Sequence, residues 1–183
     1  MTLRKLLIAL GIVVLAQTGV LAAMVVDRTL LLKRGREITL PIIPVDPRDI
    51  FRGEYVRLNY DISTVPGMLL QGPAPRRNQP FYVTIAKNPQ GGWTPVKVTA
   101  AMPQETDPDR IVLKGRSRMR FPGSTQVTYG IESYFVPEGQ GRRLEDLARE
   151  KKMAALVAVD SSGNAAIKGL IIDGVLQYEE PVF

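Results

Sequence analysis

The chain has 183 residues, with 24 lysines and arginines against 18 aspartates and glutamates, and a formal net charge of +6. It contains no cysteine and no histidine, which excludes disulfides, thiolate nucleophiles, histidine-ligated zinc and a Ser-His-Asp triad. This length suits one domain of about 150 residues and a short additional segment. The positive charge is mild, so we expect no nucleic-acid partner, and the sequence indicates neither a metal site nor a cofactor.

A transmembrane segment is predicted near the N-terminus. Residues Leu6 to Val26 contain no charged side chain, and as a helix they would rise about 31 Å, close to the roughly 30 Å of a bilayer's hydrocarbon core. Arg4 and Lys5 precede them, as in an export signal. A signal peptide cleaved near Val14-Leu15-Ala16 is one alternative, and a buried core helix is another. The segment continues well past that site and is apolar all round, so we expect an uncleaved signal anchor.

The anchor implies a domain organisation, which is a tail (1–5), a transmembrane signal-anchor helix (6–26), a basic stem (27–36) and a single β-rich domain (37–183). The stem either attracts anionic lipid headgroups or is simply solvated. Its basic residues are Arg28, Lys33, Arg34 and Arg36. Counting nearby lysines and arginines alone would place the domain in the cytoplasm. The short charged tail instead resembles the start of an export signal, so we expect an extracytoplasmic domain on a single-pass anchor.

The most strongly patterned segment of the domain is Phe51 to Tyr60. A short strand, Glu37 to Ile43, and a proline-bearing turn precede it. Its second half alternates in steps of two, which predicts a strand of about eight residues with Val56, Leu58 and Tyr60 facing the core. Two interpretations stay open, namely a structural strand whose tyrosine hydroxyls bond to the backbone, or a contact surface for a partner. The residues of the candidate contact surface are Arg52, Gly53, Glu54, Tyr55, Arg57, Leu58 and Tyr60.

The same segment resembles a known signature. Residues 53–60, Gly-Glu-Tyr-Val-Arg-Leu-Asn-Tyr, are similar to the octapeptide that names the GDYXXLXY family of bacterial proteins. Four positions match, and Glu54 stands where the family name has aspartate. The resemblance implies a chain of similar length with an N-terminal hydrophobic segment, placed in the bacterial inner membrane with its domain facing the periplasm or the outside. It implies no activity. The matching residues are Gly53, Tyr55, Leu58 and Tyr60.

The middle of the domain is predicted to consist of strands and turns. Thr64 to Pro80 is rich in proline and glycine and is expected to be a long surface loop. Its apolar centre, Met68 to Leu70, either caps the core, which we favour, or contacts a partner or the membrane. Phe81 to Lys87 and Trp93 to Ala100 are expected to form a hairpin. Arg110 to Phe121 is either one long bent strand or a pair of strands. Its second half carries a row of basic residues that either binds phosphate, carboxylate or lipid headgroups or forms a solvated face. These residues are Arg116, Arg118 and Arg120.

The C-terminal third is predicted to add a strand, a helix and a second hairpin. Gln126 to Phe135 is the expected strand, and Arg142 to Lys152 is the one clear helix of the domain, with a narrow apolar face. Ala154 to Val159 and Ala165 to Ile172 flank a turn and form the second hairpin, and Val175 to Tyr178 follows as a last strand. About nine short strands with one short helix favour a mainly antiparallel β barrel or sandwich.

Two classes of function fit these features. The first is a non-enzymatic, membrane-anchored module that binds an integral membrane protein or another envelope component. The second is a membrane-anchored hydrolase that uses paired carboxylates or a Ser/Lys pair, because neither chemistry needs histidine. No serine precedes Ser63, and nothing in the sequence brings Asp46, Asp49 and Glu54 together. We therefore expect a binding module rather than an enzyme, and we assign no catalytic residue.

Overall fold

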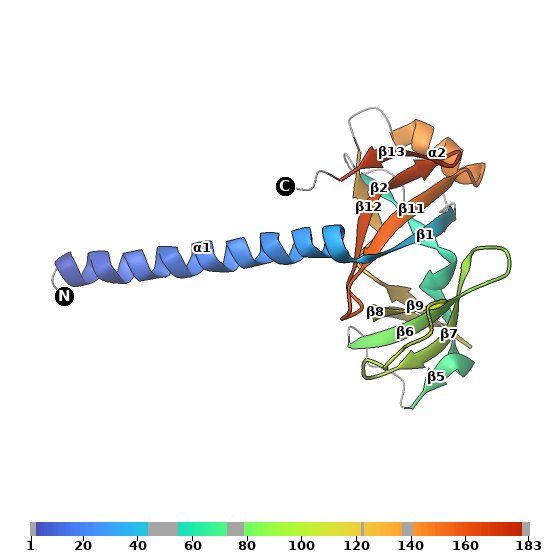
Figure 1. The fold of residues 1–183 in the computed structure, drawn as a ribbon, viewed down its shortest axis with the longest axis horizontal. Coiled ribbons are helices and arrows are strands. Elements are labelled where there is room, and N and C mark those ends of the chain that lie inside the picture. Colours follow the sequence, from blue (N-terminus) through green and yellow to red (C-terminus); the bar gives the residue numbers. More distant parts are fainter. Residues whose placement is uncertain (1–2, 44–54, 73–78, 122, 137–140, 181–183) are drawn as a thin grey trace.

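The computed structural model describes residues 3–43, 55–72, 79–121, 123–136 and 141–180. Figure 1 shows one long helix, α1, that projects from a β-rich domain and carries the N-terminus at its far end. The helices are α1 (Leu3–Arg34) and α2 (Gly141–Arg149), with short 3₁₀ turns η2 (Asp61–Ser63) and η3 (Gly67–Leu69). The strands are β1 (Arg36–Ile43), β2 (Tyr55–Arg57), β3 (Asn59–Tyr60), β4 (Thr64–Pro66), β5 (Leu70–Gln71), β6 (Pro80–Lys87), β7 (Trp93–Thr99), β8 (Arg110–Phe121), β9 (Ser124–Thr128), β10 (Ser133–Phe135), β11 (Met153–Val159), β12 (Ala165–Ile172) and β13 (Val175–Glu179).

The described strands form three sheets that are almost entirely antiparallel. The first sheet has the order β13-β12-β11-β1-β3, the second pairs β10 with β2, and the third has the order β4-β9-β8-β6-β7-β5. Among these strands, β5 and β7 are the one parallel pair. Helix α2 contacts the sheet that contains β1 and β11. The prediction of a mainly antiparallel β fold with one short helix and an N-terminal apolar helix is confirmed.

A single hydrophobic core joins the sheets. Phe81 and Leu113 enter it from the third sheet, Leu40 and Leu170 from the first, and Leu144 from α2, and each of these side chains is almost completely buried. Burying one such leucine or phenylalanine contributes roughly 1.5–3 kcal/mol. The core therefore holds together strands that are far apart in sequence, and it fixes the loops that carry the polar residues.

Several predicted elements are confirmed. Strands β6 and β7 pair as the expected hairpin, and so do β11 and β12. The 110–121 segment is one long strand, β8, rather than two. The turn before β13 has positive φ at both Asp173 and Gly174, 49° and 80°, as a type I′ turn requires. Local patterns decided the two hairpins and the last turn, because alternation and turn residues lie within these elements, but they left open whether residues 110–121 form one strand or two.

Three predicted elements differ from the structure. The single strand expected through the signature is divided, because β2 ends at Arg57 and pairs with β10, while β3 begins at Asn59 and pairs with β1. The strand expected over 126–135 is also divided, into β9 and β10, by a turn at Gly130, whose φ is 84°. The 64–80 segment contains short strands β4 and β5, and of its apolar centre Leu69 and Leu70 pack against the core as expected, whereas Met68 is exposed to solvent.

Helix α1 passes directly into the domain. Among the described residues it is the one helix long and apolar enough to cross a membrane. It continues through most of the segment expected as a basic stem and ends at Arg34, and β1 begins two residues later. Leu32 is buried against the domain, and the last turns of α1 contact β11 and β12. The basic residues of the last turn suit the negative end of the helix dipole.

Gly35 is the residue that lets the end of α1 lie against β11. A Cβ built at this position would lie 2.5 Å from the Leu31 carbonyl oxygen and 3.0 Å from both the Ala158 Cβ and the Val159 nitrogen. A Cβ built at Gly19, within α1, would meet nothing within 4 Å. The close packing at Gly35 therefore has no room for a side chain.

We predict that Gly35→Ala lowers the free energy of unfolding by about 1–3 kcal/mol, because the added methyl group overpacks the junction. Gly19→Ala is the matched control, and we expect no loss of domain stability from it. Urea unfolding of the full chain in detergent micelles, followed by the fluorescence of the single tryptophan, Trp93, measures both. Equal midpoints for the two variants would contradict the proposed role of Gly35.

Candidate functional site

The first half of the signature is only partly described. Arg52, Gly53 and Glu54 lie outside the described residues. Tyr55 opens β2, where it pairs through its backbone with Phe135 of β10, but its side chain is also outside the described part. The contact surface that the sequence suggests for these residues therefore stays a prediction.

The second half of the signature is bonded to a distant turn. The Leu58 backbone N–H donates to the Glu132 carbonyl oxygen at 2.9 Å. The Tyr60 hydroxyl donates to the Ile131 carbonyl oxygen at 2.7 Å, across 71 positions of sequence. Leu58 and Tyr60 are both buried. Their role in this structure is to hold the 129–132 turn, as the structural interpretation of the signature predicts for its tyrosine hydroxyl.

The 129–132 turn also makes a tyrosine hydrogen bond to the segment that follows the signature. The Tyr129 hydroxyl donates to the Ile62 carbonyl oxygen at 2.7 Å. The Glu132 carboxylate accepts hydrogen bonds from the backbone N–H groups of Tyr129, at 2.6 Å, and Gly130, at 3.0 Å. Burial first, and then the negative charge of Glu132, raise the pKa of Tyr60 and of Tyr129 well above the ordinary tyrosine value. Both hydroxyls therefore stay protonated and remain donors throughout the physiological pH range.

A cavity of about 140 Å³ opens beside these contacts. This volume has room for several waters or for a carboxylate-sized group. It is bounded by the end of β2, the turn after β3, strands β8 and β9, and the 129–132 turn. Its polar lining includes Arg57, Ser63, Arg118, Gln126, Thr128 and Glu132.

A β-bulge separates the expected row of arginines. The pairing of β8 with β9 passes from Ser117 with Val127 to Met119 with Gln126, so Arg118 is an extra residue without a partner in the ladder. Bulges of this kind redirect a side chain, and Arg118 lines the cavity. Arg116 is exposed but does not line the cavity, and the side chain of Arg120 lies outside the described part.

Ser63 is one of several polar residues of this cavity that the sequence did not indicate, together with Gln126, Thr128 and Glu132. Its side chain is 2% exposed, and its Oγ has no hydrogen-bond partner among the described residues. Leaving a buried hydroxyl unpaired costs about 1–3 kcal/mol, so an orphan hydroxyl in a cavity wall favours a polar group that enters the cavity. A single serine in a 3₁₀ turn carries no sequence motif, and no local signal identifies it.

Comparison with protein-family models matches residues 17–170 to the GDYXXLXY protein family. The chain belongs to the GDYXXLXY family. The match begins within α1, includes the signature and extends into β12, so it covers most of the domain. Comparisons with curated proteins and with solved structures gave no match.

In this GDYXXLXY protein, the family signature supplies both structural and solvent-facing residues. Leu58 and Tyr60 hold the 129–132 turn, whereas Arg57 is only half-buried and lines the cavity. The structure thus brings one arginine of the signature and one arginine of the 116–120 row, Arg118, to the same place. From the sequence alone, these residues belong to two separate candidate surfaces, the signature and the basic row of residues 116–120.

Catalytic chemistry receives no support from the described part of the GDYXXLXY chain. Its described residues contain no group of three or more carboxylates, histidines or cysteines that could hold a metal. Ser63 makes no hydrogen bond to a lysine among the described residues, and the Glu132 carboxylate is bonded to the backbone of its own turn. The carboxylates Asp46, Asp49 and Glu54 lie outside the described residues.

Proposed function

We propose that this GDYXXLXY protein is a non-enzymatic module, anchored by α1 in the bacterial cytoplasmic membrane, whose extracytoplasmic domain binds a membrane-protein partner. The partner contributes an acidic side chain that enters the cavity between Arg57 and Arg118. The supporting observation is the meeting of these two arginines, which come from separate sheets, at one open cavity beside the family signature.

The chemistry of the cavity suits a carboxylate. A guanidinium group binds a carboxylate with two parallel hydrogen bonds, and such charge-assisted bonds are about twice as strong as neutral ones. Arg57 is half-buried, so water and salt screen its charge less than they screen a surface charge. The Ser63 hydroxyl is available to donate to the same carboxylate, which would remove the cost of leaving it unpaired. Arg118 is exposed and would accelerate the approach of an acidic partner.

We predict that Arg118→Glu reduces recovery of the partner at least tenfold, since a reversed charge at a charge-pair contact costs more than about 1.4 kcal/mol. Arg57→Glu should have an equal or larger effect. Arg116→Glu is the matched control, because Arg116 lies two positions away on the same strand, is exposed and does not line the cavity. The measurement is quantitative mass spectrometry after cross-linking in native membranes and capture of the full chain.

The outcomes separate three interpretations. Loss of one membrane protein with Arg57→Glu and Arg118→Glu, but not with Arg116→Glu, supports the proposal. Equal recovery with all three variants means that the cavity is not the contact. Loss of a non-protein envelope component in place of a protein would keep the cavity as the site but change the class of partner. Thermal unfolding of each variant establishes that the domain remains folded.

A further inference from the structure

A second and larger cleft lies where α1 enters the domain. It has a volume of about 1260 Å³ and is bounded by the last turns of α1, the 102–106 segment and the turn between β11 and β12. It shares no lining residue with the cavity beside the signature. Pockets for drug-sized ligands have volumes of roughly 300–1,000 Å³, so this cleft has room for a lipid headgroup and its glycerol.

The position of the cleft along α1 places its opening at the membrane surface. Its first lining residues, Asp27 and Arg28, directly follow the uncharged segment that ends at Val26. At 1.5 Å per residue, Arg28 lies roughly 3 Å and Arg34 roughly 12 Å beyond Val26. The headgroup layer is roughly 5–8 Å thick on each side of a bilayer. Helical side chains lean toward the N-terminus, so the long Arg34 side chain can extend back toward that layer.

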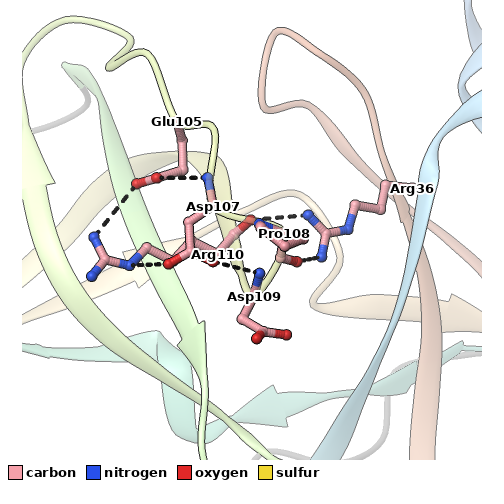
Figure 2. A network of polar contacts seen from close by, with 6 residues as sticks. All are labelled: Arg36, Glu105, Asp107, Pro108, Asp109 and Arg110. Atoms are coloured by element: carbon pink, nitrogen blue, oxygen red, sulfur yellow. Dashed lines mark hydrogen bonds and ion pairs between the residues drawn. The ribbon is translucent and has the colours of Figure 1, made fainter.

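Polar contacts fix the wall of the cleft that faces α1 (Figure 2). The Arg36 guanidinium donates to the carbonyl oxygens of Pro108 and Arg110, the latter at 3.0 Å. The Arg110 guanidinium pairs with Glu105 at 3.8 Å and with Asp107 at 3.3 Å. Arg36 and Arg110 therefore hold the wall in place, and the charge of Arg110 is paired with Glu105 and Asp107, whereas among the described residues Arg36 contacts only neutral carbonyl groups. A site with a fixed wall loses little conformational entropy when a ligand binds.

The charges that remain in the cleft favour an anion. The Asp160 carboxylate accepts hydrogen bonds from backbone N–H groups of its own turn at 2.8 and 2.9 Å. Arg28 and Arg34 are exposed, and neither guanidinium has a hydrogen bond or an ion pair with the rest of the described chain. Asp27 and Asp160 are the lining carboxylates that no basic side chain pairs with in the described chain. The whole lining carries four arginines against three carboxylates, so the cleft is net positive, and Arg28 and Arg34 are its available guanidinium groups.

Apolar side chains line the same cleft. Leu30 is 40% exposed and Met102 is 39% exposed, and both belong to the lining together with Leu31 and Pro103. Leu30 lies beyond the uncharged segment, so its side chain is exposed to water, which is unfavourable for an apolar group. Guanidinium groups next to exposed apolar side chains, at the surface of a membrane, match a ligand with an anionic head and a hydrocarbon body.

We propose that this cleft binds the phosphate headgroup of an anionic phospholipid from the adjacent leaflet. Arg28 and Arg34 contact the phosphate, and Leu30 and Met102 contact the glycerol and the first methylene groups. Inorganic phosphate shares the headgroup chemistry but not the apolar contacts. The site is independent of the partner contact proposed for Arg57 and Arg118, and it does not depend on which side of the membrane the domain occupies.

The test is native mass spectrometry of the full chain released from mixed micelles that contain equal amounts of phosphatidylglycerol and phosphatidylcholine. The measured quantity is the ratio of the two lipids retained by the protein. We expect the wild type to prefer the anionic lipid, and Arg28→Gln and Arg34→Gln each to lower that preference about fivefold. Lys33→Gln is the matched control, because it removes a charge next to Arg34 but outside the cleft. A second arm adds inorganic phosphate at millimolar concentration.

Each outcome decides the proposal. The proposal of a specific site is supported if Arg34→Gln lowers the ratio of retained phosphatidylglycerol to phosphatidylcholine and Lys33→Gln leaves this ratio unchanged. Equal losses with both variants would show general attraction to basic residues and would overturn it. Displacement of the anionic lipid by inorganic phosphate would also overturn it, because the site would then be one for a soluble anion. All three residues are exposed, and unchanged thermal unfolding of the variants excludes loss of the fold as the cause.

Discussion

Tyr60→Ala is expected to lower the free energy of unfolding by about 3–5 kcal/mol, the cost typical of replacing a buried aromatic side chain with alanine. Tyr60 is 1% exposed and is among the largest fully buried side chains of the core. Tyr60→Phe keeps the ring but removes the hydroxyl that donates to the Ile131 carbonyl oxygen at 2.7 Å, and we expect it to cost about 1–3 kcal/mol. The signature tyrosine is thus predicted to act mainly on stability.

Tyr82→Phe serves as the control for the hydroxyl effect. Tyr82 is half-buried in β6, and its hydroxyl has no hydrogen bond within the described part of the chain. We expect its unfolding midpoint to stay close to that of the wild type. Urea unfolding of the full chain in micelles, followed by Trp93 fluorescence, measures the whole series. If Tyr60→Phe were as stable as Tyr82→Phe, the bond to the 129–132 turn would not stabilise the fold.

The second large effect is alkaline destabilisation of the domain. Burial raises the pKa of Tyr60 and Tyr129 far above 10, and it raises the pKa of Tyr134 to about 12. Above pH 10 the unfolded chain loses protons from these tyrosines while the folded chain keeps them, so the unfolded state is favoured as the pH rises. Each fully protected tyrosine lowers the free energy of unfolding by up to about 1.4 kcal/mol per pH unit. Below pH 10 these groups contribute no pH dependence.

Tyr129→Phe separates this effect from the titration of lysines. A side-chain hydrogen bond to Glu37 raises the pKa of Lys168, and one to Glu150 raises the pKa of Lys152, so both lysines act in the same pH range and in the same direction. The tyrosine variant should reduce the slope above pH 10 by up to about 1.4 kcal/mol per pH unit, whereas Lys168→Gln should leave the tyrosine contribution intact. Urea unfolding followed by circular dichroism from pH 9 to 12 gives the slopes. An unchanged slope in Tyr129→Phe would contradict the prediction.

Local sequence patterns were sufficient for most of the fold because most elements are determined by their own residues. Strands β6, β7, β11 and β12 alternate or are bounded by turn residues, and both hairpins follow from their turn chemistry. The division of the signature strand at Leu58 has a different origin. The bond from Leu58 to the Glu132 carbonyl takes the chain from one sheet to another, and no pattern within residues 53–60 contains that information.

The candidate site was predicted only in part for the same reason. Arg57 and Arg118 were both identified, but as members of separate surfaces, because the tertiary fold alone brings β2 and β8 to one cavity. The bulge that frees Arg118 from the β8–β9 ladder depends on the register between two strands. Ser63 could not be identified from the sequence, because it stands out only by its burial in the folded domain. The predicted 6–26 segment describes only the uncharged part of α1, and the helix continues through charged residues to Arg34, where basic side chains stabilise its last turn.

The junction of α1 with β1 has a mechanical consequence. Only Gly35 separates the helix from the strand, and β1 is an interior strand that is bonded on one side to β11 and on the other to β3. Within the described residues 3–43, the structure therefore has no linker between helix and domain, and with α1 in a membrane the domain would be held near one height and one tilt relative to the bilayer. A membrane partner of the kind proposed above would then need its binding surface at that height, so that lateral diffusion in two dimensions alone would complete the encounter.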